Sequence, residues 1–219
     1  INLITDIYLD SNFISEFDPV KAKQILEEAG FNDSNQDGIL DKKINKNDEE
    51  VTNLTIEILI LDDPDLNSMA QIISQNLKDI GIEATVESLS FNEFNNRLQT
   101  NSFQAALIGQ KPIANEIADF YAFFHSSQIP PFGFNFAFYK SQEADELLEK
   151  LRVLNSDKQE SLFQLGELIK KDLPIIPLFQ GEIYWLIDKN FNISQISFVN
   201  STGERFNNVN NWYLNTKRI

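Results

Sequence analysis

The sequence predicts an α/β fold with a mixed, mainly parallel sheet of the βαβαβ type, flanked by helices. Between residues 54 and 108, apolar segments of strand length alternate with segments whose apolar residues recur at helical spacing. This order implies parallel strands joined by right-handed crossovers. Composition supplies the core, because 42% of the 219 residues are hydrophobic and 18 are Phe.

The first helix is predicted at residues 18–30. Asp18 offers an N-cap oxygen, Pro19 fits the first helical position, and Gly30 closes the helix. Residues 54–61 are apolar, β-branched and of strand length, which predicts a mostly buried strand.

A second helix begins at Asp63-Pro64 and ends at Gly81. Its apolar residues recur at helical spacing, so we expect them all to lie in the core. They are Leu66, Met69, Ile72, Ile73, Leu77 and Ile80.

The alternation continues along the chain. A strand at residues 82–89, a short helix at 91–98 and a strand at 103–108 complete the βαβαβ section. Beyond them, the apolar pattern predicts two amphipathic helices and one strand, at residues 141–154, 157–171 and 183–188.

Charge and cysteine content exclude several partners. The net charge of −15 opposes binding to nucleic acid or to anionic lipid. The absence of Cys excludes disulfides, thiolate catalysis and most zinc sites. No run of about 18 apolar residues occurs, so we expect no direct membrane insertion of this chain.

The best metal candidate is the loop from Asp33 to Asp41. It offers oxygens at positions 1, 3, 5 and 9 of a calcium loop, with Gly38 at position 6. Position 12 is Ile44, where a calcium loop needs a bidentate carboxylate. A turn rich in Asx residues that leads to a hairpin explains the same pattern, and we predict no metal site.

The residues do not favour catalysis. His125 is the only histidine, so a Ser-His-Asp arrangement would have to use it, and no G-x-S-x-G motif occurs. We expect His125 to cap or pack at the end of an aromatic segment. Many acidic residues, Asp145 among them, fall on predicted helices where a solvated face explains them. We predict no catalytic residue and no cofactor.

Several phrases together resemble the family 5 extracellular solute-binding proteins, the peptide and oligopeptide receptors of ABC importers. They are DPVKAKQILEEAGF at 18–31, FHSSQIP at 124–130 and PIIPL at 174–178, together with a strand that ends in Gly109 before an aromatic segment. The similarity runs from about residue 17 to residue 219, which corresponds to the C-terminal part of a family member.

The resemblance implies a periplasmic-binding-protein-like lobe that captures a solute against a second lobe. Residues 1–16 would be an entry segment, residues 17–198 the ligand-binding lobe, and residues 199–219 a tail that returns to the N-terminal lobe. It also implies an extracellular or periplasmic location, tethering through an N-terminal lipid anchor of a lipoprotein, and partnership with the importer's membrane subunits.

The ligand site is expected beyond the third strand, since open α/β sheets bind ligands at the carboxyl ends of their strands. The turn after Gly109 would supply polar contacts, and the loop that follows the aromatic segment would supply a wall. The predicted ligand-binding residues are Gln110, Lys111, Glu116, Phe134, Asn135 and Tyr139. Phe132, Phe134 and Phe136 would alternatively fill the core.

One departure from the family bears on the solute. Peptide receptors of this family often carry Trp after the strand-ending Gly and an Asp that meets the peptide's α-ammonium group. Here Gln110 follows that Gly, Ile113 and Ala114 stand around the expected acid, and Glu116 comes later. A free α-ammonium would lose a contact worth about 1.5–3 kcal/mol, which leaves open another solute or a peptide held by its backbone.

Three other classes of function stay open. A cell-surface protein-interaction module built on the same lobe would bind a protein rather than a solute. A calcium-stabilised structural domain would melt at a lower temperature in the presence of a chelator. A hydrolase would lose turnover on the substitution His125→Ala.

Overall fold

The structure is a computed structural model that describes residues 17–43, 51–109, 120–153, 158–178, 186–192, 206 and 209–214. The chain divides into two compact units. The first, which we call the sheet unit, comprises Ser15–Gly109 and Tyr121–Glu146. The second unit comprises Ile1–Ile14, Gln110–Phe120 and Leu147–Ile219.

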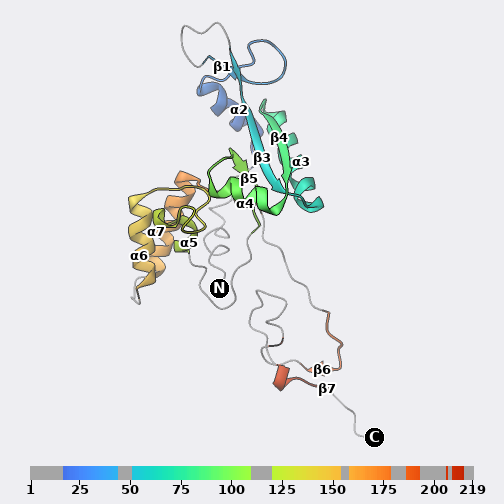
Figure 1. Ribbon diagram of the computed structural model, residues 1–219, viewed down its shortest axis with the longest axis vertical. Helices are drawn as coiled ribbons and strands as arrows, with labels where there is room; N and C mark the ends of the chain where they lie inside the picture. Colours follow the sequence, from blue (N-terminus) through green and yellow to red (C-terminus); the bar gives the residue numbers. More distant parts are fainter. Residues whose placement is uncertain are drawn as a thin grey trace. The chain divides into compact units, whose positions relative to one another are not determined.

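A three-stranded parallel sheet organises the sheet unit (Figure 1). The central strand β3 (Thr55–Leu61) pairs along its whole length with β4 (Glu83–Leu89) and over two residues with β5 (Ala105–Ala106). The helices α3 (Pro64–Asp79) and α4 (Phe91–Gln99) connect the strands in chain order. The βαβαβ arrangement predicted from the sequence is therefore confirmed.

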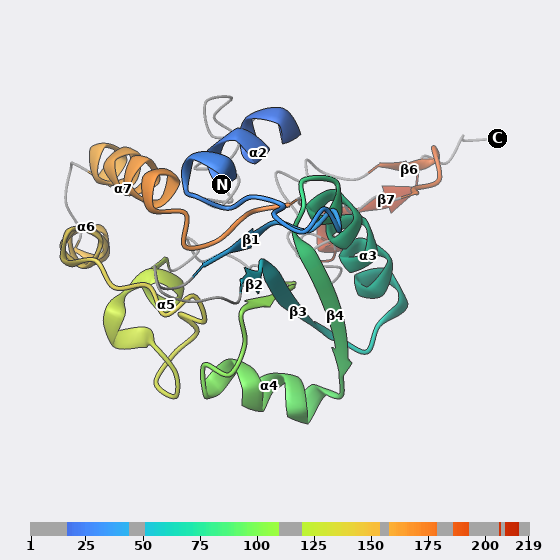
Figure 2. The ribbon, with the colours of Figure 1, turned by 90° about the horizontal axis from the view of Figure 1, so that it is seen from above.

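Strand β3 buries side chains on both of its faces. Because successive residues of a strand point to opposite faces, Ile58 and Ile60 pack with residues of α3, and Leu59 packs with Phe94 and Leu98 of α4. Figure 2 shows α3 and α4 on either side of the strands. The near-continuous apolar sequence of this strand follows from this two-sided burial.

An ion-pair group reinforces the α4 face of the sheet. Arg97 of α4 donates hydrogen bonds to Glu57 of β3 and to Glu87 of β4, the latter at 3.0 Å. All three side chains remain partly exposed, so solvent screens the attraction. The Arg97 guanidinium contacts both paired strands, and these contacts help to position α4 on the sheet.

The helix starts agree with the sequence signals. Asp63 accepts hydrogen bonds from the backbone N–H groups of Asp65 and Leu66 at 2.9 and 3.0 Å. At the start of α4, Glu93 N–H donates to the N-cap hydroxyl of Ser90 at 3.4 Å, and this hydroxyl donates to the Glu93 carboxylate at 2.7 Å.

The first helix and a hairpin lie at the start of the sheet unit. Helix α2 (Pro19–Glu28) begins at Asp18, whose carboxylate accepts from Lys21 N–H at 2.8 Å. Strands β1 (Asp41–Lys42) and β2 (Thr52–Asn53) form an antiparallel pair. This confirms the hairpin expected after the Asx-rich loop.

Three expectations were wrong in part. Ile72 is 63% exposed, because the stripe that faces the sheet runs through Leu66, Ala70, Ile73 and Leu77. The third strand is limited to β5, which pairs only with Ile58 and Leu59. In the strand predicted at 183–188, the described residues 186–188 are not in a strand.

The remaining elements follow the sheet. They are α5 (Phe120–Phe124), the 3-10 helix η1 (Ser126–Gln128), α6 (Gln142–Arg152), α7 (Lys158–Asp172), β6 (Phe191–Asn192), η3 (Val209–Asn211) and β7 (Tyr213–Leu214). The bounds of α6 and α7 confirm the two amphipathic helices. Their buried residues recur at helical spacing: Ala144, Leu147 and Leu148 in α6, and Leu165, Leu168 and Ile169 in α7. Strands β6 and β7 pair antiparallel.

Two glycines with the same backbone conformation offer a matched test of packing. Gly38 and Gly81 have φ angles of +88° and +87°, but a Cβ at Gly81 would lie 2.7 Å from Cγ of the buried Leu40, whereas a Cβ at Gly38 would meet nothing. Gly38→Ala should cost about 1–2 kcal/mol from backbone strain. Gly81→Ala should cost about 1–3 kcal/mol more from overpacking. Urea unfolding of both variants measures the difference, and equal losses would contradict this packing.

Candidate functional site

The six predicted ligand-binding residues fall into two groups. Gln110, Lys111 and Glu116 lie outside the described residues. Phe134, Asn135 and Tyr139 lie in the stretch that follows α5 and precedes α6, which we call the 125–139 segment. The geometry of the candidate site is therefore the geometry of this segment.

His125 opens the segment and caps η1. Its ring stacks on Tyr121 with centroids 4.0 Å apart. Its Nδ1 accepts hydrogen bonds from the backbone N–H of Ser127 at 3.0 Å and from the Ser127 hydroxyl at 2.8 Å. The expectation that His125 caps and packs is confirmed.

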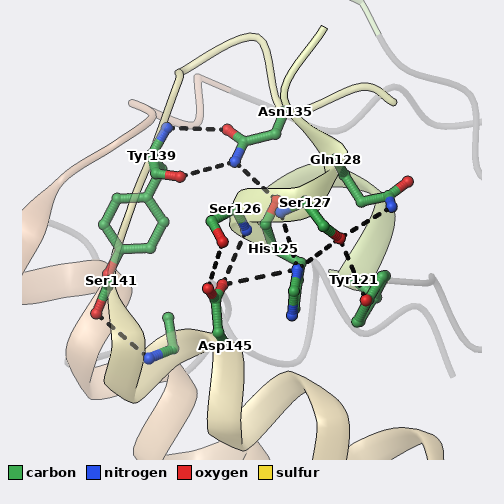
Figure 3. A network of polar contacts seen from close by, with 10 residues as sticks. Tyr121, His125, Ser126, Ser127, Gln128, Asn135, Tyr139, Ser141 and Asp145 are labelled. Carbon is green, nitrogen blue, oxygen red and sulfur yellow. Dashed lines mark hydrogen bonds and ion pairs between the residues drawn. The ribbon is translucent and has the colours of Figure 1, made fainter. Parts of the chain in front are cut away.

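Asp145, in the first turn of α6, is bonded to the start of the segment (Figure 3). Its carboxylate accepts from the backbone N–H of Ser126 at 2.8 Å and from the Ser126 hydroxyl at 2.5 Å. It also lies 3.8 Å from His125 Nδ1. The carboxylate therefore joins α6 to the turn at 125–127.

Asn135 joins the two ends of the segment. Its side chain is fully buried, and its Nδ2 donates to the carbonyl oxygens of His125 at 3.1 Å and Tyr139 at 2.9 Å. Its Oδ1 accepts from Tyr139 N–H at 3.0 Å. Both amide hydrogens are thus used, as the burial of a polar group requires. Figure 3 shows the amide between these backbone groups.

The three phenylalanines around Asn135 have different environments. Phe136 packs on the cluster of Leu59, Phe94 and Leu98. Phe134 is 58% exposed, with its ring centroid 6.2 Å from that of Phe136. The core alternative holds for Phe136 and is wrong for Phe132, which is 83% exposed. Phe134 keeps ring surface that a ligand could cover.

A close backbone approach shapes the same loop. A Cβ on Gly133 would lie 2.6 Å from the carbonyl oxygen of Gln128, which no other residue could accommodate without a shift. Asn135 N–H donates to this same carbonyl at 3.0 Å. The turn that carries Phe132 and Phe134 therefore folds back tightly on η1.

Among the described residues, Ser127, His125 and Asp145 are not arranged as a Ser-His-Asp triad. In a Ser-His-Asp triad, the acid and the nucleophile bond to opposite nitrogens of the imidazole. Here both the Ser127 hydroxyl and the Asp145 carboxylate approach Nδ1 of His125. The arrangement can cap and join backbone segments, but it cannot pass a proton from Ser127 through the ring to Asp145.

The Asx-rich loop is closed by its own hydrogen bonds. Asp33 accepts from the backbone N–H groups of Asp37 and Gly38 at 3.1 and 3.0 Å, and the buried Asp41 accepts from Ser34. Within the residues that the structure describes, no group of three or more His, Cys, Asp or Glu could hold a metal ion. Ile44 lies outside the described residues.

Comparison with known proteins gives the family. The model of bacterial extracellular solute-binding proteins, family 5 (middle region), matches residues 5–131. The chain is 31% identical, over 180 residues, to the oligopeptide-binding protein AppA of Bacillus subtilis. The chain belongs to family 5 of the bacterial extracellular solute-binding proteins. The match covers 80% of this chain and 31% of the relative, so the chain spans about a third of the length of the curated relatives it matches.

Solved structures of relatives have the same fold. The structure of AppA from Bacillus subtilis in complex with a nonapeptide has a TM-score of 0.64 and 25% identity, covering 91% of this chain and 38% of that chain. NikZ from Campylobacter jejuni in complex with Ni(L-His) has a TM-score of 0.60 and 26% identity, covering 74% of this chain and 31% of that chain. The periplasmic-binding-protein-like fold expected for a family 5 protein is confirmed.

Sequence reasoning missed the role of Asp145. It was assigned to a solvated helix face, but its carboxylate is bonded to Ser126. A signal was present, because residues three apart on a helix share a face and Leu148, three residues later, is buried.

Among the helices of the described residues, none combines the length and apolar character needed to cross a membrane.

The Asx-rich loop gives a pH prediction. The hydrogen bond from Ile39 N–H, followed by the Asn35 side chain, lowers the pKa of Asp37 below 3.8. A carboxyl whose pKa is lower in the folded state adds stability above its unfolded pKa, and this stability is lost as the pH falls through the folded value. NMR titration of Asp37 should place its midpoint below 3.8. Asp37→Asn should remove this part of the acid dependence of unfolding, and a midpoint at or above 3.8 would contradict the hydrogen bonds.

Proposed function

We propose that the protein is the solute-binding receptor of an ABC importer of the peptide or oligopeptide class, and that it captures its ligand between two lobes of which this chain forms one. The observation that carries the proposal is the 31% identity to an oligopeptide-binding protein over 80% of the chain. A further relative, the dipeptide-binding protein of Pseudomonas aeruginosa, is 24% identical over 183 residues.

The proposed lobe is residues 17–198, preceded by the entry segment 1–16 and followed by the tail 199–219 that returns to the other lobe. In this division, Gln110, Lys111 and Glu116 supply polar contacts, and Phe134 and Tyr139 supply a wall. Two-lobe closure would couple occupancy to shape, which the importer's membrane subunits could then recognise.

The protein acts, in this proposal, as a receptor rather than an enzyme. The match to a family of binding proteins and to an oligopeptide-binding relative supports this view. Family membership supports an extracellular or periplasmic location, and tethering by an N-terminal lipid anchor is part of the proposal.

Solute capture can be tested on the protein as its source produces it. Small molecules extracted from the natively purified protein are identified by mass spectrometry, and each is then tested for a rise in melting temperature. We expect co-purified peptides, and saturation at 100 times the dissociation constant should stabilise by about 2.7 kcal/mol.

Parallel additions separate the ligand classes. Dipeptides, nonapeptides and nickel with L-histidine are added separately. One relative is a dipeptide-binding protein, and the structures of two others contain a nonapeptide and Ni(L-His). A response to nickel with L-histidine alone would replace the peptide class with a metal chelate. A protein that responds to none of them would contradict the receptor proposal.

A further inference from the structure

We propose that Asn135 is a positioning residue for ligand binding, which holds the ring of Phe134 exposed for contact with an apolar side chain of a peptide. This inference rests on the proposed function. It differs from the expectation that Asn135 contacts the ligand directly.

The first step is that the amide of Asn135 is already fully used. Both of its hydrogens are donated to backbone carbonyls, and its oxygen accepts from Tyr139 N–H. A ligand contact through this amide would break at least one buried hydrogen bond. Leaving a buried donor or acceptor unsatisfied is costly, so the amide acts within the protein.

The second step is that both neighbours of Asn135 in the sequence are aromatic, but they differ in burial. Phe136 is packed against the cluster at Leu59 and Phe94, whereas Phe134 is more than half exposed. Because Asn135 is bonded on each side to His125 and Tyr139, the backbone between these two rings is fixed. Fixing the backbone sets the direction in which the ring of Phe134 projects.

The third step concerns the two half-buried rings that support the Phe134 ring. Its ring centroid lies 6.1 Å from that of Phe123 and 6.2 Å from that of Phe136, the latter in an edge-on arrangement. Aromatic rings at these separations attract each other. The supported ring offers its exposed surface with little further loss of conformational freedom, and such pre-organisation raises affinity.

The chemistry of this surface selects the class of ligand group. An exposed phenyl ring gains by covering apolar area and by stacking on another ring, and it offers no hydrogen bond. The ring of Phe132, which is 83% exposed, belongs to the same turn. An apolar or aromatic side chain of a bound peptide is the group that fits.

The test uses two series of nonapeptides built from Ala and Ser, one with Phe placed at each position in turn and one with Ser there instead. For the unmodified protein we expect Phe at one position to raise affinity roughly 3- to 10-fold over Ser. Phe134→Ala should abolish this gain. Asn135→Ala should abolish it too, and the double variant should lose no more than Phe134→Ala alone.

Matched controls separate positioning from general stability. Asn76→Ala removes an exposed asparagine from α3 and should leave the gain intact. If Asn135→Ala does not fold, Asn135→Asp replaces it, because its carboxyl oxygen can still accept from Tyr139 N–H. In the Asn135 variants, backbone amides of residues 126–139 should exchange hydrogen faster than in the unmodified protein, and those of β3 should exchange at the same rate.

The outcomes are distinct. A Phe gain that survives in the folded Asn135 variants would overturn the inference and leave the proposed function in place. Loss of the gain in both Phe134→Ala and the Asn135 variants supports it. Failure of every nonapeptide to bind the unmodified protein would instead overturn the peptide-receptor proposal, and this inference with it.

Discussion

Burial of both faces of β3 is the constraint on which the rest of the sheet unit depends. Leu59 and Ile60 point in opposite directions and are both fully buried, and each contributes about 1.5–3 kcal/mol of hydrophobic stabilisation. One face needs α3 to cover it, and the other needs α4. The order of strands and helices agrees with this, because the crossover helices of a parallel sheet cover its strands on both faces.

The candidate site depends on the same strand. Phe136 joins the cluster of Leu59, Phe94 and Leu98, so the 125–139 segment is attached to the sheet by hydrophobic packing. Polar contacts then fix the segment internally, through Asn135, and at its start, through Asp145. Of the three neighbouring rings of Phe123, Phe134 and Phe136, only that of Phe134 is exposed. Because its backbone is fixed, this ring could contact a ligand without rearrangement of the segment.

Local signals predicted most of the fold, and non-local contacts account for what they missed. Caps at Asp18 and Asp63 were readable because cap and helix are adjacent in sequence. The extent of β5 depends on pairing with a strand more than 40 residues earlier, and the burial of Asn135 depends on backbone groups at both ends of its loop. The bond between Asp145 and Ser126 could not be predicted from the helix alone, because Ser126 lies on another element.

The most direct test of this account is a crystal structure of the protein with a peptide bound. The account predicts that the ring of Phe134 lies within about 4 Å of an apolar ligand side chain. It also predicts that the Asn135 amide still donates to the carbonyls of His125 and Tyr139. A structure in which the Asn135 amide turns to the ligand, or in which Phe134 faces solvent away from it, would contradict the account.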